Sequence, residues 1–166
     1  MRFTYCPHCG RKLTQRSIGD EGIMPFCDEC NIPLWDSFTT SVIVAVVNEF
    51  DEIALLRQSY VSKDTYVCVA GIMKPDESAE DAVRREVKEE IGQKAEVIEY
   101  IGSYPYPGKE MLMLGFKARV KKKELRLSGE VDSAEWFSFV DAPSKLRDGS
   151  IAKRLVECVI EEAKNE

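Results

Sequence analysis

The sequence predicts an α/β domain preceded by a small cysteine-rich module. Three observations carry this prediction. Four cysteines lie within the first 30 residues as two close pairs, apolar runs rich in β-branched residues recur after residue 40, and two later segments repeat apolar residues at helical spacing. The 166 residues suffice for one domain of ordinary size with a small module attached. We expect a module over residues 1–36 and a larger domain over residues 37–166.

Composition and charge exclude several classes of protein. Hydrophobic residues make up 44% and charged residues 31%, which is typical of a globular chain and excludes a disordered or collagen-like one. The formal net charge of −6 does not favour a general binder of nucleic acids or membrane surfaces. No apolar run approaches the roughly 18 residues of a membrane span, and the N-terminal residues lack an apolar segment of signal-peptide length. We therefore expect a soluble, cytoplasmic protein.

The two cysteine pairs have the spacing of a structural metal site. Two residues separate Cys6 from Cys9 and Cys27 from Cys30, and 17 residues lie between the pairs. This spacing lets both thiolates of a pair turn toward one point, and two pairs complete a tetrahedral sulfur shell. Gly10 follows the first pair, where such a turn often needs left-handed backbone. The pattern predicts a zinc ribbon with these four ligands.

Two disulfides or a redox-active dithiol are the alternatives to zinc. Both are weaker, because intracellular thiols are kept reduced and the redox motif normally occurs once, beside a βαβ unit. His8 is expected to shape the first turn rather than to bind the metal. Residues 1–36 contain four basic and five acidic residues, a poor footprint for phosphate contacts. The module is therefore expected to act as a folding staple or as a docking and dimerisation element.

The strands of the larger domain are predicted from apolar runs bounded by turn residues. Residues 41–47 form a β-branched run, and residues 53–56 read as the returning strand of a hairpin after a polar turn. Cys68 lies in the next run and is expected to be a buried small hydrophobe. Further strands are predicted over residues 66–70, 95–103, 111–120 and 134–139.

Two helices are predicted in the same domain. The first begins at Ser78, which stands three residues before Asp81 as in a capping box, and ends at Gly92. Its apolar residues recur every fourth position and form a core stripe of Ala79, Val83, Val87 and Ile91. The second helix covers about residues 150–164, and its inward-facing residues are expected to be Ile151, Leu155, Cys158 and Val159.

Three carboxylates project from one side of the first predicted helix. Glu86 and Glu90 are four positions apart and Glu86 and Glu89 are three apart, so they are neighbours on the helix surface. Such close like charges repel one another, and a divalent cation removes the repulsion. Hard oxygen ligands suit Mg²⁺ or Mn²⁺, and Mg²⁺ is usually held by few carboxylates together with substrate phosphates. The alternative is a solvated acidic face paired with neighbouring basic residues.

The wider spacing decides between these alternatives. Gly71 is followed by five residues and Glu77, and after seven more comes Arg85-Glu86-Val87-Lys88-Glu89-Glu90-Ile91-Gly92. This resembles the Nudix box, Gly-x5-Glu-x7-Arg-Glu-U-x-Glu-Glu-x-Gly-U, in which U is aliphatic. Every specified position matches except the last, where Gln93 stands. The resemblance implies an α/β/α sandwich with a mixed sheet, and a hydrolase that cleaves a nucleoside diphosphate linked to another moiety.

The resemblance also implies a metal site for Mg²⁺ or Mn²⁺. Its carboxylate ligands would be Glu86, Glu89 and Glu90, joined by a backbone carbonyl of Gly71 or Ala70. Bound cations of this kind polarise a pyrophosphate, neutralise developing charge and lower the pKa of an attacking water.

The remaining box residues are given catalytic and supporting roles by the same resemblance. Arg85 would orient the glutamates, including Glu86, by ion pairing. Glu77 would brace the loop or helix through that arginine. Glu89 is the candidate base for the attacking water.

The chain further resembles the NADH pyrophosphatase branch of this family, which carries a four-cysteine zinc ribbon before the Nudix domain. Residues 103–107, Ser-Tyr-Pro-Tyr-Pro, are similar to the branch signature Ser-Gln-Pro-Trp-Pro-Phe-Pro. Glu130 matches its extra metal-binding glutamate, and Ala152 matches a position whose backbone lines the site. The resemblance implies hydrolysis of NADH or NAD to AMP and nicotinamide mononucleotide, by a homodimer.

The sequence departs from that signature at Tyr104, Tyr106, Gly108 and Lys109, which replace Gln, Trp, Phe and Pro. The two tyrosines are either residues that stack on a substrate base or ordinary strand aromatics. ADP-ribose, another dinucleotide or an NAD-capped RNA end is therefore an alternative substrate. A non-catalytic module that senses a nucleotide is the alternative of another class, and its box would be degenerate, whereas this box keeps every charged position.

Overall fold

The computed structural model describes residues 3–165, and the chain divides into two compact units, Met1–Thr39 and Thr40–Glu166. The first unit is a three-stranded antiparallel sheet in the order β1-β2-β3. Its elements are β1 (Thr14–Ser17), the 3-10 helix η1 (Gly19–Glu21), β2 (Ile23–Cys27) and β3 (Ile32–Pro33). Its small core consists of Cys6, Cys27 and Leu34 with partly buried neighbours, so the cysteines take the central place that apolar side chains hold in a larger domain.

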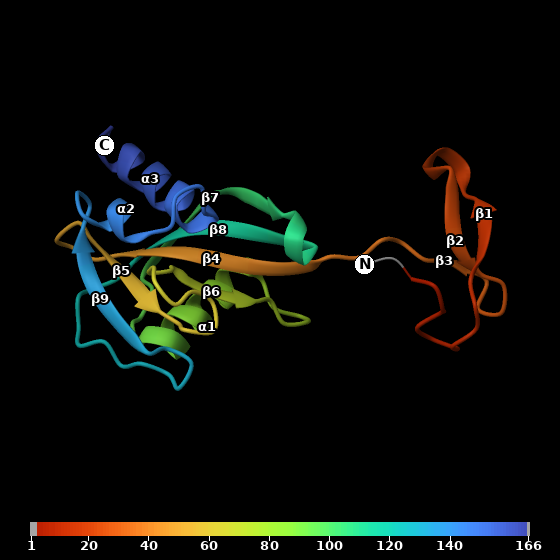
Figure 1. Cartoon of the computed structure of the whole chain (residues 1–166), viewed down its shortest axis with the longest axis horizontal. Coiled ribbons are helices and arrows are strands. Elements are labelled where there is room, and N and C mark those ends of the chain that lie inside the picture. Colours follow the sequence, from red (N-terminus) through yellow and green to blue (C-terminus); the bar gives the residue numbers. More distant parts are fainter. Residues whose placement is uncertain (1–2, 166) are drawn as a thin grey trace. The chain divides into compact units, whose positions relative to one another are not determined.

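The second unit is built around a six-stranded sheet (Figure 1). The strands run in the order β7-β8-β4-β5-β9, and β6 pairs with β4. Their bounds are β4 (Thr39–Val47), β5 (Glu52–Arg57), β6 (Val69–Ile72), β7 (Val97–Tyr106), β8 (Met111–Arg119) and β9 (Ser133–Ser138). The hairpin predicted for the first two apolar runs is confirmed, because β4 and β5 pair antiparallel with Val46 opposite Ala54.

The central strand β4 is buried on both faces and divides its side chains between two cores. Successive side chains of a strand point to opposite faces, so the even-numbered and odd-numbered residues separate. The core on one face contains Val42, Val44 and Val46 with α1 (Ala79–Ile91). The core on the other contains Ile43, Ala45 and Val47 with α2 (Ala142–Lys145) and α3 (Ile151–Ala163).

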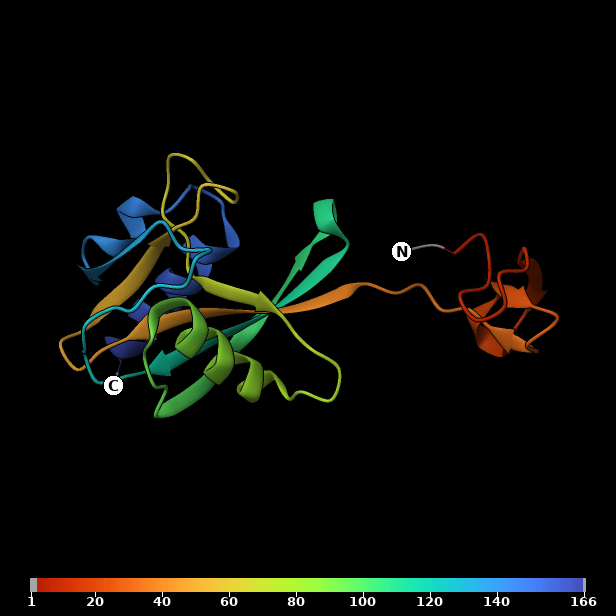
Figure 2. The ribbon, with the colours of Figure 1, turned by 90° about the horizontal axis from the view of Figure 1, so that it is seen from below.

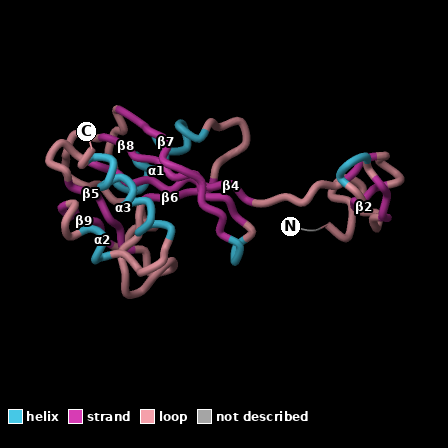
Figure 3. The backbone as a smooth tube through the Cα atoms, turned by 90° about the horizontal axis from the view of Figure 1, so that it is seen from above, coloured by secondary structure: helices cyan, strands magenta, loops and turns pink. Residues whose placement is uncertain are grey.

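The two helical layers are visible on opposite faces of the sheet. Figure 2 shows α1, in green, on the face seen from below, and Figure 3 shows α3 on the face seen from above. The expected α/β/α sandwich with a mixed sheet is thereby confirmed. The tip of the β7–β8 hairpin, which carries the 3-10 helix η2 (Pro107–Lys109), extends beyond the rest of the sheet in Figure 2.

Helix α1 begins and ends where its capping residues predict. The Ser78 hydroxyl accepts a hydrogen bond from the backbone N–H of Asp81 at 3.2 Å, and Gly92 closes the helix with φ of +68°. Val83, Val87 and Ile91 of the predicted stripe are fully buried. This stripe therefore packs the helix against the sheet.

Two expectations for this unit are corrected by the structure. The predicted inward position of Cys158 is wrong: the residue is exposed, because the buried stripe of α3 consists of Ala152, Leu155, Val156, Val159 and Ile160. Strand β6 starts at Val69 rather than at residue 66, since Tyr66 and Val67 form only isolated bridges. Cys68 is 2% exposed, as predicted. None of the helices described is long and apolar enough to cross a membrane.

Candidate active site and metal centres

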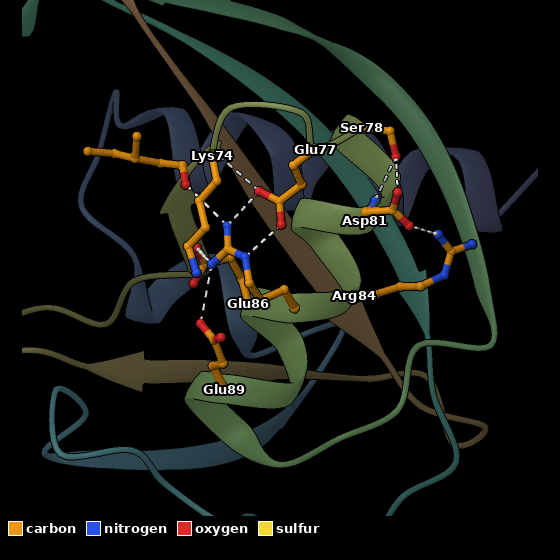
Figure 4. A network of polar contacts seen from close by, with 9 residues as sticks. Lys74, Glu77, Ser78, Asp81, Arg84, Glu86 and Glu89 are labelled. Atoms are coloured by element: carbon orange, nitrogen blue, oxygen red, sulfur yellow. Dashed lines mark hydrogen bonds and ion pairs between the residues drawn. The ribbon is translucent and has the colours of Figure 1, made fainter.

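Figure 4 shows the polar network around α1 to which Glu77, Glu86 and Glu89 belong. Arg85 is the residue that bonds to all three. Its Nε and Nη2 atoms donate to the two carboxylate oxygens of Glu77 at 2.7 and 2.8 Å. Its Nη1 atom donates to Glu86 at 2.5 Å and to Glu89 at 3.2 Å, and Nη2 also reaches the carbonyl of Ile72 at 3.2 Å. The side chains of Arg85, Glu77 and Glu86 are at most 17% exposed, so water screens the pairs among them little, whereas Glu89 is 54% exposed. One guanidinium therefore orients three carboxylates and fixes the end of β6.

Glu77 connects this network to the loop between β6 and α1. Besides Arg85, its carboxylate accepts the backbone N–H of Lys74 at 3.0 Å. The hydrogen bond from Arg85 is the largest cause that lowers the pKa of Glu77, to about 2. Glu77 is thus a charged brace for the loop, the geometry expected for this box position.

Glu86 lies directly against the backbone of β6. A Cβ atom built on Gly71 would lie 1.7 Å from Oε1 of Glu86, so only glycine fits at this position. The carbonyl of Gly71 accepts a hydrogen bond from the Ser41 hydroxyl at 2.8 Å. Glu86 on α1 and Gly71 on β6 are thereby in close contact.

Glu90 lies deeper than the other glutamates of the box and is 4% exposed. Its Oε1 atom accepts a hydrogen bond from Nε2 of Gln58 at 2.7 Å, and its Oε2 atom accepts the backbone N–H of Ala70 at 3.3 Å. Gln58 is itself 4% exposed and follows β5 directly. Glu90 is therefore positioned by residues from three elements.

Glu130 lies in the loop between β8 and β9, which is attached to the end of α1. The backbone N–H of Ser128 donates to the carbonyl of Glu90 at 3.3 Å, and that of Arg126 donates to the carbonyl of Ile91 at 3.1 Å. Gln93 continues this attachment through Nε2, which donates to the carbonyl of Glu124 at 3.1 Å. These bonds hold the Glu130 loop beside the Glu90 end of the glutamate cluster.

Burial makes the ionised forms of Glu86 and Glu90 unfavourable, although Arg85 forms an ion pair with Glu86. Burial is the largest cause that raises the pKa of Glu86, and burial raises the pKa of Glu90 to about 7. Glu86 and Glu130 add to the shift at Glu90 by repulsion. A divalent cation relieves both costs, and carboxylate and carbonyl oxygens are the donors that hard cations prefer. The donor set therefore fits such an ion.

The four cysteines of the first unit fit a tetrahedral metal more directly. Among residues 3–165, they are the group whose ligand atoms all lie within 4.8 Å of one another. The Sγ atoms of Cys6 and Cys30 are 3.9 Å apart and those of Cys9 and Cys27 are 3.5 Å apart. A tetrahedral site with metal–sulfur bonds of about 2.3 Å has sulfur–sulfur edges of roughly 3.8 Å. All four thiols are free, so the disulfide alternative does not describe this structure.

The two turns that hold these cysteines have matching backbones. Gly10, after the first pair, has the left-handed φ of +74° that was predicted, and Asn31, after the second pair, has φ of 55°. The backbone N–H of Gly10 donates to the carbonyl of Cys6 at 2.8 Å, which closes the first turn. Each turn therefore directs its two thiols to the same side.

The residues predicted to contact substrate lie on other elements. Tyr104 is 6% exposed in the core under α3, where its ring packs on Gly115 and Arg154 lies 5.2 Å from its centroid. Tyr106 is half-buried at the end of β7. Ala152 is 9% exposed in the first turn of α3. The burial of Tyr104 agrees with a strand aromatic, and substrate contact by these three residues stays a prediction.

Two residues beside the glutamates were missed by the sequence reasoning. Gln58 and Tyr60 belong to the loop after β5, which contains no box residue. No periodic or spaced motif marks them, since they reach the site only because β5 and β6 both pair with β4 in the sheet. A polar residue directly after a buried apolar strand was the available signal for Gln58.

Comparisons with known proteins match both the sequence and the fold. The NUDIX domain family matches residues 37–157. A NAD-capped RNA hydrolase NudC from Pseudomonas putida KT2440 is 35% identical over 157 residues, covering 94% of this chain and 55% of the relative. The protein of that name from Pseudomonas syringae pv. syringae B728a is 36% identical over 159 residues, covering 95% and 56%. The chain thus spans just over half the length of these curated relatives.

Solved structures support the fold. A NUDIX hydrolase from Nitrosomonas europaea has a TM-score of 0.77 at 17% identity, covering 98% of this chain and 93% of the other. The NUDIX domain of Shewanella oneidensis NrtR, complexed with ADP ribose, has a TM-score of 0.68 at 14% identity, covering 83% and 94%. At these identities the likeness concerns the fold alone.

Proposed function

Because the chain belongs to the NUDIX domain family, we propose that it is a metal-dependent pyrophosphohydrolase that cleaves an NAD-type dinucleotide to AMP and nicotinamide mononucleotide. The observation that carries the proposal is the cluster of box glutamates, which Arg85 and Gln58 orient and in which burial raises the pKa of Glu86 and Glu90. The names of the curated relatives, which are hydrolases of NAD-capped RNA, support an NAD-type substrate.

The proposed catalytic metal is Mg²⁺ or Mn²⁺. Its carboxylate ligands would be Glu86, Glu89, Glu90 and Glu130, and the family resemblance adds a backbone carbonyl of Gly71 or Ala70. Such an ion, when bound, neutralises charge on the diphosphate and lowers the pKa of a coordinated water. These donors would come from α1, β6 and the Glu130 loop, and the backbone bonds from Arg126 and Ser128 to the end of α1 support this ligand set.

The other proposed roles belong to Glu89, Arg85 and Glu77. Glu89 is 54% exposed and is held only at one side by Arg85, so its carboxylate has access to a water molecule and can take its proton. Arg85 fixes Glu86 and Glu89 in one orientation, and Glu77 fixes Arg85. Because these contacts exist before substrate binds, the box residues are oriented in advance of the reaction.

The first unit is proposed to hold a structural Zn²⁺ on Cys6, Cys9, Cys27 and Cys30. Four thiolates close the coordination shell, so no position is left for a substrate or a reactive water. Zinc would supply the stability that so small a core lacks. A homodimer, implied by the family resemblance, stays a prediction.

A panel of substrates tests the proposed function. NADH, NAD⁺, ADP-ribose, diadenosine polyphosphates, nucleoside triphosphates and an NAD-capped RNA are each incubated with Mg²⁺ or Mn²⁺, and the products are identified by chromatography. Release of AMP and reduced nicotinamide mononucleotide from NADH is the expected result. Preference for ADP-ribose would change the assigned substrate but not the type of reaction. Nucleotide binding without turnover of any substrate would favour the sensing module instead.

A further inference from the structure

The turn formed by residues 58–62 is tied to the glutamate site at two points. Gln58 donates to Glu90 at 2.7 Å, and the backbone N–H of Ser59 donates to Oδ2 of Asp132 at 2.6 Å. Asp132 is two residues after Glu130. The turn therefore bridges the two segments that supply the proposed metal ligands, one on α1 and one in the Glu130 loop.

Tyr60 is the next residue after these two anchors. The backbone N–H groups of Val61 and Ser62 both donate to the carbonyl of Gln58, at 2.9 and 3.0 Å. These bonds close residues 58–62 into a tight turn, and Tyr60 is part of that turn. The tyrosine is 69% exposed, although its neighbour Gln58 is almost fully buried. The anchored turn thus carries an aromatic residue whose side chain is exposed to solvent.

The turn places Tyr60 close enough to the carboxylates of the site for their charges to act on its hydroxyl. Partial burial is the largest cause that raises its pKa, and the negative charges of Glu130, Glu90 and Glu86 raise it further. All three are proposed metal ligands. A phenol hydroxyl with a raised pKa keeps its proton at neutral pH and can donate a hydrogen bond.

We propose that Tyr60 is a substrate-binding residue whose hydroxyl donates a hydrogen bond to a non-bridging oxygen of the substrate's diphosphate. The inference rests on the proposed function, because a diphosphate binds at the ions that the glutamates hold. A phenol offers the diphosphate a donor without adding another negative charge to a site already rich in carboxylates. Since the diphosphate is common to NADH and ADP-ribose, the contact serves both substrates equally.

Two variants separate this contact from stacking of the ring on a base. Tyr60→Phe keeps the ring and removes the hydroxyl, whereas Tyr60→Leu removes both. Tyr100→Phe is the matched control, because Tyr100 is also exposed, at 57%, but lies on β7 against Phe116. The dissociation constant of α,β-methylene ADP is measured with Mg²⁺ by calorimetry, together with kcat and KM for NADH and ADP-ribose and the melting temperature.

Tyr60→Phe is expected to weaken binding of the analogue about tenfold, the size of one hydrogen bond to a charged acceptor. KM should rise by a similar factor for both substrates, Tyr60→Leu should lose little more, and Tyr100→Phe should match the wild type. Wild-type binding by Tyr60→Phe would overturn the inference, and a loss confined to Tyr60→Leu would assign the ring to stacking.

The proposed function and the role of Tyr60 are contradicted by different results. A wild type that binds the analogue but hydrolyses no substrate contradicts the proposed function, while the comparison of dissociation constants still decides the role of Tyr60. A wild type that hydrolyses NADH, with Tyr60→Phe unchanged in every constant, contradicts only the role of Tyr60. Absence of analogue binding by the wild type contradicts both.

Discussion

Gly71 and Glu86 fit together so closely that a Cβ atom on Gly71 would lie 1.7 Å from Oε1 of Glu86. The glycine is required by this contact and not by its backbone, whose φ is outside the left-handed region. The first and the central residues of the box are thus coupled through space: the absence of a side chain on β6 leaves room for the carboxylate on α1.

We expect Gly71→Ala to displace the carboxylate of Glu86 and to lower kcat/KM for NADH by about 10-fold to 100-fold, the range for residues that orient metal ligands. Steady-state kinetics at saturating Mg²⁺ measure the effect. Gly102→Ala on β7 is the control, because the nearest atom to its Cβ would be 3.7 Å away. Equal activity of both variants would show that Glu86 has space to move.

The pair of Glu77 and Arg85 predicts a dependence of stability on pH. The pKa of Glu77 is lowered to about 2 from an unfolded value near 4.5, so its contribution to folding is complete above pH 4.5 and is lost as pH falls toward 2. The melting temperature of the wild type should therefore fall more steeply between pH 5 and pH 3 than that of Glu77→Gln. Thermal denaturation at a series of pH values measures this, and parallel curves would contradict it.

Gln58→Leu is expected to impair the use of metal. Glu90 would keep only the longer bond from Ala70, so the Mg²⁺ concentration for half-maximal rate should rise about 10-fold to 100-fold. Binding of Mn²⁺, followed by electron paramagnetic resonance, should weaken in parallel. Asn48→Leu is the control, because it removes a similarly buried amide whose partners are Glu52 and the backbone N–H of Phe50 at the β4–β5 turn. A similar loss in both variants would mean that a general loosening of the fold causes the effect.

Cys27→Ser should release zinc from the first unit and leave the box network intact. The variant loses one of four thiolates, and binding of a structural metal is coupled to folding. Zinc content by atomic absorption should fall to a small fraction of one ion per chain, with a lower melting temperature. Cys158→Ser, at an exposed cysteine outside the cluster, should keep its zinc. Unchanged metal content in Cys27→Ser would contradict the site.

Local patterns explain what the sequence predicts well. Helix α1 is bounded by a serine that caps its first turn and a glycine in the left-handed conformation, and both act within a few residues. The cysteine pairs are local in the same sense. The fold class follows from these elements together with the alternation of β4 between two cores.

Contacts between distant segments explain what the sequence does not predict. Gln58 and Glu90 are 32 residues apart and meet only because the sheet places the end of β5 near α1. Gln93, the residue that departs from the box, is 1% exposed and bonds to the carbonyl of Glu124, which fastens the loop leading to Glu130. Cys158 lies outside the stripe of α3 because the position of α2 and the sheet, rather than spacing alone, selects the buried face.

The release of AMP from NADH by the wild type and by Glu86→Gln, with Mg²⁺ added or withheld, tests the central claim most directly. The account predicts release that requires Mg²⁺ and that falls by at least about 100-fold in the variant, because the change removes a charged metal ligand and keeps the shape of the side chain. Release at the wild-type rate by Glu86→Gln, or without the added ion, would contradict a metal-dependent reaction at the box glutamates.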